Sequence, residues 1–438
     1  MTEAGVVREW APAVSGALAD RAIHTATEVA RRLVPANVLT ELEKQPLVLH
    51  LEEVDTVTGV AVLHGEMDRL EGGWADRAHE KAWSSPSSRS NGPPFPHPAR
   101  SVASAAWRTR LGRSAATASD TSGWWPFSTT TSRRPWPSAP PKMLEKPYGL
   151  AFHTYDVISG LAGAATYLLQ VKENTLAKNA LKDTLTAFVA ISGERDGVPN
   201  WFTPAQEMFP NTPIGELYPN GTFNCGLAHG IPGPLALLSL AASEGVLVPG
   251  QVEAISRLGH WIANRRSDDR WGPNWPMGVG PIDAAGSYPK GHPTHNAWCY
   301  GSPGVARSLW LAGNAVDDDS LREIAVEAMM AVRQRPWRDR AMGDSPGLCH
   351  GVSGLLQIVL RFGHQTGDPR FADFSAELTE YLLRMYDPAL PYGFSSLAEG
   401  GKYSDRPGFL DGASGVALTL LSAAADQPPT WDRQLLLT

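Results

Sequence analysis

Cysteine is the residue type in this sequence with the clearest capacity for chemistry, and it occurs at Cys225, Cys299 and Cys349. Three cysteines cannot pair completely, so free thiols or metal ligands are expected rather than a disulfide framework. Cys349 stands directly before His350, and a thiol beside an imidazole can form half of a zinc site. Because a buried free cysteine is also common in protein cores, this pair alone leaves both packing and ligation open.

The stretch that carries this pair has two relatives in the chain. The three stretches are Gly347-Leu-Cys-His-Gly-Val-Ser-Gly354, Trp298-Cys-Tyr-Gly-Ser-Pro-Gly304 and Gly226-Leu-Ala-His-Gly-Ile-Pro-Gly233. The first two together supply a Cys2His set, formed by Cys299, Cys349 and His350. Three protein ligands with a fourth position open are typical of catalytic zinc. Such a position can convert water to hydroxide, or hold an incoming thiol as thiolate near neutral pH.

A polar residue directly precedes the first glycine in four related loops: His229, Tyr300, His350 and Asp411. His229 could serve as a general acid or base, or simply cap a helix. Tyr300 could donate a hydrogen bond to an oxyanion, or pack. Asp156 lies four residues before Gly160, where it could orient a histidine or act only as a helix cap.

A further group of aromatic and imidazole side chains precedes the Cys299 loop. It comprises His292, His295 and the run from Trp271 to Trp275. These residues could line a groove for a peptide, or they could belong to a surface loop rich in proline and glycine. The sequence leaves both interpretations open.

The elements that must position these residues form a repeat. Five loops share the pattern Gly-x-x-Gly, beginning at Gly160, Gly230, Gly301, Gly351 and Gly412. Their spacings of 70, 71, 50 and 61 residues accommodate one helix out and one helix back. Each loop leads into a helix that is apolar on nearly all sides and therefore buried, and the intervening segments are amphipathic.

Buried inner helices alternating with amphipathic outer helices predict an all-α protein, an α/α toroid. Residues 1–438 are interpreted as one such domain, with the clearest repeats over residues 148–425. The paired glycines allow sharp turns that bring the helix N-termini to one end of the ring. A Gly-led helix start is also expected in degraded form at Asp55–Gly59.

The segment 83–142 differs from the rest, because it is rich in Ser, Pro, Arg and Trp and shows no helical or strand period. It carries eight basic residues and one acidic residue. A solvated basic linker is one interpretation. Five tryptophans favour another, in which this stretch is translated out of frame and replaces a helical repeat.

Composition excludes several classes of protein. A net charge of −7 argues against nucleic acid as the main partner and permits a cationic peptide. No apolar run is long enough to span a membrane, and the acidic start does not resemble a signal peptide, so the cytoplasm is the expected location. Asp411-Gly-Ala-Ser-Gly415 has the wrong order for a serine hydrolase, and no phosphate-binding or kinase motif occurs.

Three motifs in order, Gly226-Leu-Ala-His-Gly230, Trp298-Cys-Tyr-Gly301 and Cys349-His-Gly351, closely resemble those of the lanthionine synthetase C-like proteins, the lanthipeptide cyclases. The resemblance runs from about Tyr148 to the C-terminus. It implies a toroid of seven units with one Zn²⁺ held by Cys299, Cys349 and His350. The implied reaction adds a peptide cysteine thiolate to dehydroalanine or dehydrobutyrine, which forms a thioether ring.

The same resemblance implies roles for other residues. His229 would be the acid/base, Asp156 would support it, and Tyr300 would lie close by. His295 stands where family members often carry an arginine. The implied partners are a dehydrated precursor peptide, a separate dehydratase and a synthetase complex that can be membrane-associated.

Three rival classes remain open. A prenyltransferase-like subunit also combines an α/α toroid with a zinc-activated thiol, although through other motifs. A six-hairpin glycosidase would need two carboxylates and no zinc. A non-catalytic zinc toroid that binds peptide is the alternative outside enzymes.

Overall fold

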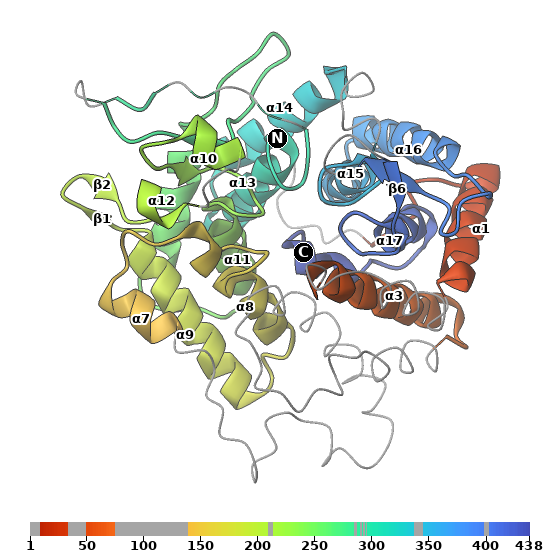
Figure 1. The fold of residues 1–438 in the computed structure, drawn as a ribbon, viewed down its shortest axis with the longest axis horizontal. Helices are drawn as coiled ribbons and strands as arrows, with labels where there is room; N and C mark the ends of the chain where they lie inside the picture. Colours follow the sequence, from red (N-terminus) through yellow and green to blue (C-terminus); the bar gives the residue numbers. More distant parts are fainter. Residues whose placement is uncertain are drawn as a thin grey trace.

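The computed structural model describes residues 9–33, 50–74, 139–208, 213–283, 287–289, 291, 294, 296–336, 345–397 and 403–438. Within these residues the chain forms an α/α toroid, accompanied by three small two-stranded ribbons. The inner helices are α3 (His50–Glu71), α8 (Leu161–Gln170), α11 (Pro232–Ser243), α13 (Ser302–Val316), α15 (Val352–Thr366) and α17 (Ala413–Ala424). From α8 to α17 each packs against the next, and α17 packs against α3, as Figure 1 shows.

Five outer helices surround the inner ones (Figure 1). They are α9 (Thr175–Ile191), α12 (Gln251–Ala263), α14 (Asp319–Gln334), α16 (Pro369–Arg384) and α1 (Gly16–Arg32). Four of them pack on the inner helix that they follow in the chain, and α1 packs on α17. Every residue of α17 is buried, whereas α16 buries one face only, which is the difference expected between an inner and an outer helix.

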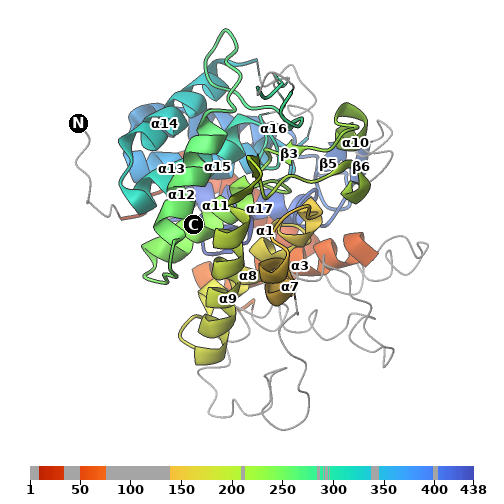
Figure 2. The ribbon, with the colours of Figure 1, turned by 90° about the vertical axis from the view of Figure 1, so that its left-hand side faces the viewer.

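Short elements lie in the segments that connect these helices. The ribbons pair β1 (Glu194–Arg195) with β2 (Val198–Pro199), β3 (Phe223–Asn224) with β4 (Gly278–Val279), and β5 (Ser395–Leu397) with β6 (Tyr403–Asp405). The remaining short helices are α7 (Ala139–Glu145), η3 (Phe152–Thr154), η4 (Ala205–Glu207) and α10 (Pro213–Leu217). Figure 2 shows α10 and the β5–β6 ribbon on the opposite side of the ring from the C-terminus.

The second glycine of the repeat is required by close packing. A Cβ on Gly304 would overlap the carbonyl oxygen of Trp298, and a Cβ on Gly354 would overlap the carbonyl oxygen of Leu348. Each of these helices therefore begins against the backbone of its own preceding loop. Gly301 adds a second requirement, because its φ of +94° lies in a region that L side chains rarely adopt.

A C-terminal segment, residues 429–437, is bound to the ring by buried arginines. It contains the short helix η6 (Trp431–Leu435), which packs against α8. Arg361 forms an ion pair with Asp432 in which both side chains are buried, with Nε to Oδ2 at 2.7 Å. Arg307 donates from Nε to the carbonyl oxygen of Leu437 at 2.9 Å. Because these groups are withdrawn from water, the segment is part of the core.

The expected architecture is confirmed, and one local prediction is wrong. The five Gly-x-x-Gly loops lead into α8, α11, α13, α15 and α17, as expected. Gly59, however, lies inside α3 rather than at a helix start. It is still needed there for close packing, since a Cβ would meet the backbone nitrogen of Phe409 at 2.6 Å.

Two expectations concern residues that are largely outside the described ranges. The atypical segment 83–142 is described only from residue 139, where α7 begins. The described residues contain six inner helices, and the seventh unit was expected in that same segment. No helix among the described residues has the length and apolar character needed to cross a bilayer.

Candidate metal centre

Backbone hydrogen bonds connect the loops that precede neighbouring inner helices. In four of these bonds an amide of one loop donates to a carbonyl of the next: Val157 to Ala228 (3.0 Å), Ala228 to Cys299 (3.3 Å), Cys299 to Cys349 (3.2 Å) and Cys349 to Leu410 (3.0 Å). In a fifth, the amide of Phe409 donates to the carbonyl of Asp55 inside α3 (3.2 Å). These bonds do not depend on side-chain type. They hold residues from six segments of the chain in one continuous arc at the end of the ring.

The arc brings the three predicted metal ligands together. One donor atom from each of Cys299, Cys349 and His350 lies within 4.8 Å of the other two. In a tetrahedral zinc site the sulfur atoms are about 3.7 Å apart, since each Zn–S bond is ~2.3 Å. Small side-chain rotations therefore suffice to close the set on one ion. Two thiolates and an imidazole form a donor set that suits Zn²⁺.

The electrostatics of the two thiols favour a cation between them. The pKa of Cys349 is raised well above its ordinary value, first by the hydrogen bond to the Cys299 thiol and then by burial. The charge of Asp411 raises the Cys349 pKa further. A divalent cation would remove this cost, because it coordinates both sulfurs as thiolates.

Asp156 and His229 form a buried hydrogen-bonded pair beside this cluster. The Asp156 carboxylate is fully buried, and its Oδ2 lies 2.6 Å from Nδ1 of His229. Its other oxygen accepts the backbone amides of Ser159 and Gly160, each at 2.7 Å. The carboxylate thus anchors the loop and orients the imidazole together. Because Nδ1 carries the proton in this bond, Nε2 is the nitrogen that can exchange one.

Tyr300 lies between the cluster of candidate metal ligands and the Asp156–His229 pair. It follows Cys299 directly, and its ring centroid is 6.3 Å from that of His229. Its hydroxyl oxygen accepts a hydrogen bond from Nδ2 of Asn224 at 3.1 Å, which leaves the hydroxyl proton available for donation. Burial raises the Tyr300 pKa above its usual range, so the hydroxyl remains protonated at neutral pH.

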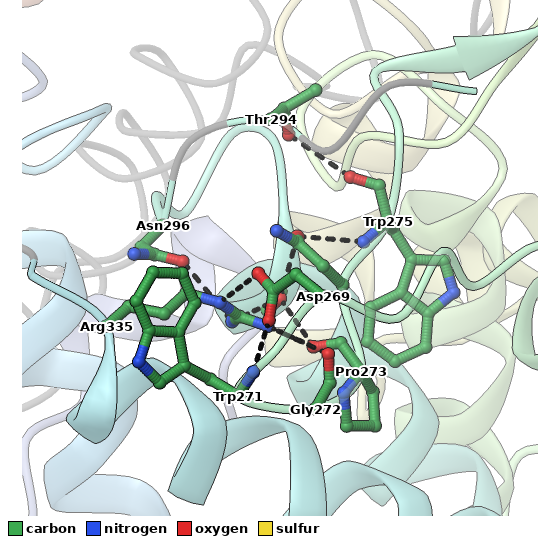
Figure 3. Close-up of polar contacts among 10 residues, drawn as sticks. Asp269, Trp271, Gly272, Pro273, Trp275, Thr294, Asn296 and Arg335 are labelled. Atoms are coloured by element: carbon green, nitrogen blue, oxygen red, sulfur yellow. Dashed lines mark hydrogen bonds and ion pairs between the residues drawn. The ribbon is translucent and has the colours of Figure 1, made fainter.

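Buried Arg335 anchors both ends of the loop that carries Cys299 (Figure 3). Its guanidinium forms an ion pair with Asp269, with Nε to Oδ2 at 2.8 Å. It also donates to the carbonyl oxygen of Pro273 at 2.7 Å and to Oγ of Ser302 at 3.1 Å. Ser302 begins α13, so this arginine ties the start of that helix to the preceding loop.

The aromatic run before the Cys299 loop has a structural role. Trp275 is fully buried, and its Nε1 donates to the carbonyl oxygen of Ile262 at 2.7 Å. It therefore belongs to the core, neither lining a groove nor facing solvent. The backbone amide of Trp271 donates to Oδ1 of Asp269 at 2.9 Å (Figure 3). His292 and His295 lie outside the described residues.

Several supporting residues were missed by reasoning from sequence. Asn224 binds Tyr300, Asp55 accepts the amide of Leu410 at 2.9 Å, and Arg335 binds the Cys299 loop. The first two carried a usable signal. Asp55 precedes Gly59 by four residues, as Asp156 precedes Gly160, and Asn224 is next to Cys225 before a repeat glycine. Arg335 carried no such signal in the sequence, because it lies at the end of an outer helix and outside the repeat motifs.

An α/α toroid whose inner loops unite a Cys2His cluster with a buried Asp–His pair defines a narrow class of proteins. The family model for lanthionine synthetase C-like protein matches residues 138–436, well over half of the chain. The chain belongs to this family.

Two relatives extend the comparison. The chain is 27% identical over 290 residues to the nisin biosynthesis protein NisC of Lactococcus lactis subsp. lactis, and the match covers 65% of this chain and 64% of NisC. The chain thus spans somewhat less than two thirds of that relative. A solved structure of nisin cyclase superposes with a TM-score of 0.70 at 20% identity, covering 94% of this chain and 96% of the other. That likeness concerns the fold.

Proposed function

We propose that this chain is a zinc-dependent lanthipeptide cyclase. The observation that carries the proposal is the convergence of Cys299, Cys349 and His350 from separate segments into one three-donor cluster. Membership of the family and the similarity to NisC support the same activity. The substrate is a ribosomally made precursor peptide that contains cysteine and dehydrated serine or threonine residues.

The reaction is an addition in which no atoms are lost. The cysteine sulfur bonds to the β-carbon of dehydroalanine or dehydrobutyrine, the double-bond electrons move toward the carbonyl as an enolate, and the α-carbon gains a proton. A bound Zn²⁺ would supply a thiolate near neutral pH by lowering the pKa of a coordinated thiol. The result is a lanthionine or methyllanthionine ring of unchanged peptide mass.

Residues of this chain transfer the proton from the thiol and deliver a proton to the α-carbon. His229 accepts the thiol proton at Nε2 and returns a proton to the α-carbon, while Asp156 fixes its tautomer through Nδ1 at 2.6 Å. Tyr300 donates its hydroxyl proton as a hydrogen bond to the enolate oxygen. His295 is proposed to add to enolate stabilisation from the position where the family often has arginine.

The partners follow from the chemistry. The dehydrated residues must be made before cyclisation, so a separate dehydratase acts first, and the two enzymes meet the peptide in a synthetase complex. We place this chain in the cytoplasm, where such a complex can lie against a membrane.

The test is incubation of the purified, zinc-loaded protein with a synthetic dehydrated peptide that contains one cysteine. Loss of free thiol at constant peptide mass, measured by alkylation and mass spectrometry, is expected at a rate well above that without protein. Peptide binding without loss of thiol, with zinc bound, would instead identify a non-catalytic toroid. A product with added mass, formed only when an isoprenyl diphosphate is supplied as a second substrate, would indicate a thiol-alkylating enzyme of the prenyltransferase kind.

A further inference from the structure

Asp411 has a carboxylate oxygen that the described structure leaves without a hydrogen bond. Its Oδ1 is buried, and no donor among the described residues lies within hydrogen-bonding distance of it. Leaving a buried acceptor unsatisfied is costly, so such an oxygen calls for a specific partner. Nδ1 of His350 lies 3.7 Å from this oxygen.

The backbone fixes Asp411 beside the metal ligands. Its neighbour Leu410 accepts the amide of Cys349 at 3.0 Å, and its own carbonyl accepts the hydroxyl of Ser396 at 2.8 Å. Asp55 holds the same loop from the opposite side by accepting the Leu410 amide. These three hydrogen bonds fix the backbone of the loop. The carboxylate of Asp411 can then reach His350 by a small change of side-chain torsion.

The two imidazoles near the site have parallel arrangements. His229 holds Asp156 through Nδ1, and His350 faces Asp411 through the same ring nitrogen. In the first pair the distance is 2.6 Å, which is a formed hydrogen bond, and in the second it is 3.7 Å. In most histidine metal sites one ring nitrogen donates its proton to a carboxylate, and the other ring nitrogen binds the metal. The carboxylate thereby fixes the orientation of the ring and its tautomer.

We propose that Asp411 is a positioning residue for the metal, an inference that rests on the proposed zinc site. His350 binds the ion through Nε2, and its Nδ1–H donates to Oδ1 of Asp411. The carboxylate thereby satisfies its buried oxygen, locks the tautomer that leaves Nε2 free, and places a negative charge near the cation. The pair closes to hydrogen-bond distance when the ion orients the ring.

The experiment compares zinc affinity in the full-length protein and in Asp411→Asn and Asp411→Ala, measured by competition with a chelator. Both variants are expected to bind Zn²⁺ about 10- to 100-fold more weakly. Asn is expected to lose less than Ala, since its amide oxygen can still accept the bond without the charge. Cobalt-substituted protein gives a second readout, and the visible ligand-field bands are expected to shift in both variants.

The matched control is Asp318→Asn, which removes the same charge from an exposed pair with His260 at 2.8 Å. Its metal affinity and cobalt spectrum are expected to remain those of the unmodified protein. If both Asp411 variants bind zinc as tightly as the unmodified protein with unchanged cobalt bands, the positioning role is wrong. Failure of the unmodified protein to bind zinc would overturn the metal site itself, which separates the two proposals.

Discussion

The indole nitrogen of Trp298 donates a hydrogen bond to the carbonyl oxygen of Leu435 at 3.0 Å, across 137 residues of chain. Trp298 is fully buried and directly precedes Cys299, one of the three proposed zinc ligands. The C-terminal segment therefore supports the loop that carries Cys299 from the other end of the ring.

Replacing the indole of Trp298 should lower both the stability of the fold and the affinity for zinc. Trp298→Phe is expected to lower the free energy of unfolding by about 1–3 kcal/mol, because it leaves a buried carbonyl unsatisfied. It should also weaken zinc binding. Urea unfolding and chelator competition measure the two effects. Trp310→Phe is the control, since its indole bonds the exposed side chain of Gln365, and its effect should stay within ~0.5 kcal/mol.

Alanine variants of the three cysteines should differ in zinc content. Cys299→Ala and Cys349→Ala are expected to lose the zinc, because two remaining ligands hold the ion too weakly. Cys225→Ala should keep about one zinc per chain. Cys225 is buried outside the cluster, and burial raises its pKa to about 12. Loss of zinc only in Cys225→Ala would contradict the assigned ligand set.

The Asp156–His229 pair should affect turnover and not metal content. His229→Asn is expected to lower kcat by about 10²- to 10⁴-fold by removing the acid/base. Asp156→Asn can still accept the loop amides, yet its amide group favours the wrong imidazole tautomer, so activity should also fall. Peptide cyclisation rates and zinc content are the measurements. His260→Asn, an exposed histidine, should match the unmodified protein.

Arg335 should be among the most sensitive positions for stability. Arg335→Ala leaves the Asp269 carboxylate and several buried acceptors unpaired, and a loss of about 3–5 kcal/mol is expected. Arg335→Lys should recover only part of this, because an ammonium group cannot reproduce the planar set of bonds. Thermal and urea unfolding report the loss. Arg384→Ala, in an exposed pair with Glu380, should leave the melting temperature nearly unchanged.

Asp55 should make stability depend on pH. Burial raises its pKa to about 7 from an ordinary value of 3.8. The folded state therefore binds the proton more tightly, so the contribution is complete below about pH 4 and is lost as pH rises through 7. Asp55→Asn cannot ionise, and its melting temperature relative to the unmodified protein should rise between pH 5 and pH 8. Exposed Asp183→Asn should show no such trend, and an equal trend in both variants would contradict the assignment.

The sequence was sufficient to predict the ring and the clustering of three candidate ligands, because both depend on local patterns. The glycine register placed Cys299 and Cys349 at equivalent loop positions, with His350 next to Cys349, and apolar periodicity identified the helices that follow. Asp156 and His229 were assigned to one site for the same reason.

Apart from Asp55 and Asn224, what was missed depends on contacts that have no local signature. The arc of backbone bonds between loops is independent of side-chain identity, so no residue type could indicate it. The C-terminal segment carries no repeat motif, so its binding by Arg307 and Arg361 had no signal in the sequence. Gly59 was taken for a helix start, although its actual role is to admit Phe409 against α3.

The C-terminal contacts also set an order of events during synthesis. Cys299 and Cys349 leave the ribosome before Leu410, which binds the Cys349 amide, and before Leu435, which binds the Trp298 indole. A nascent chain therefore exposes both thiols before the groups that hold them in place exist. At the proposed zinc site, stable metal uptake would therefore follow translation of the final helix and the segment after it, and an ion captured earlier would be held by an unfinished ring.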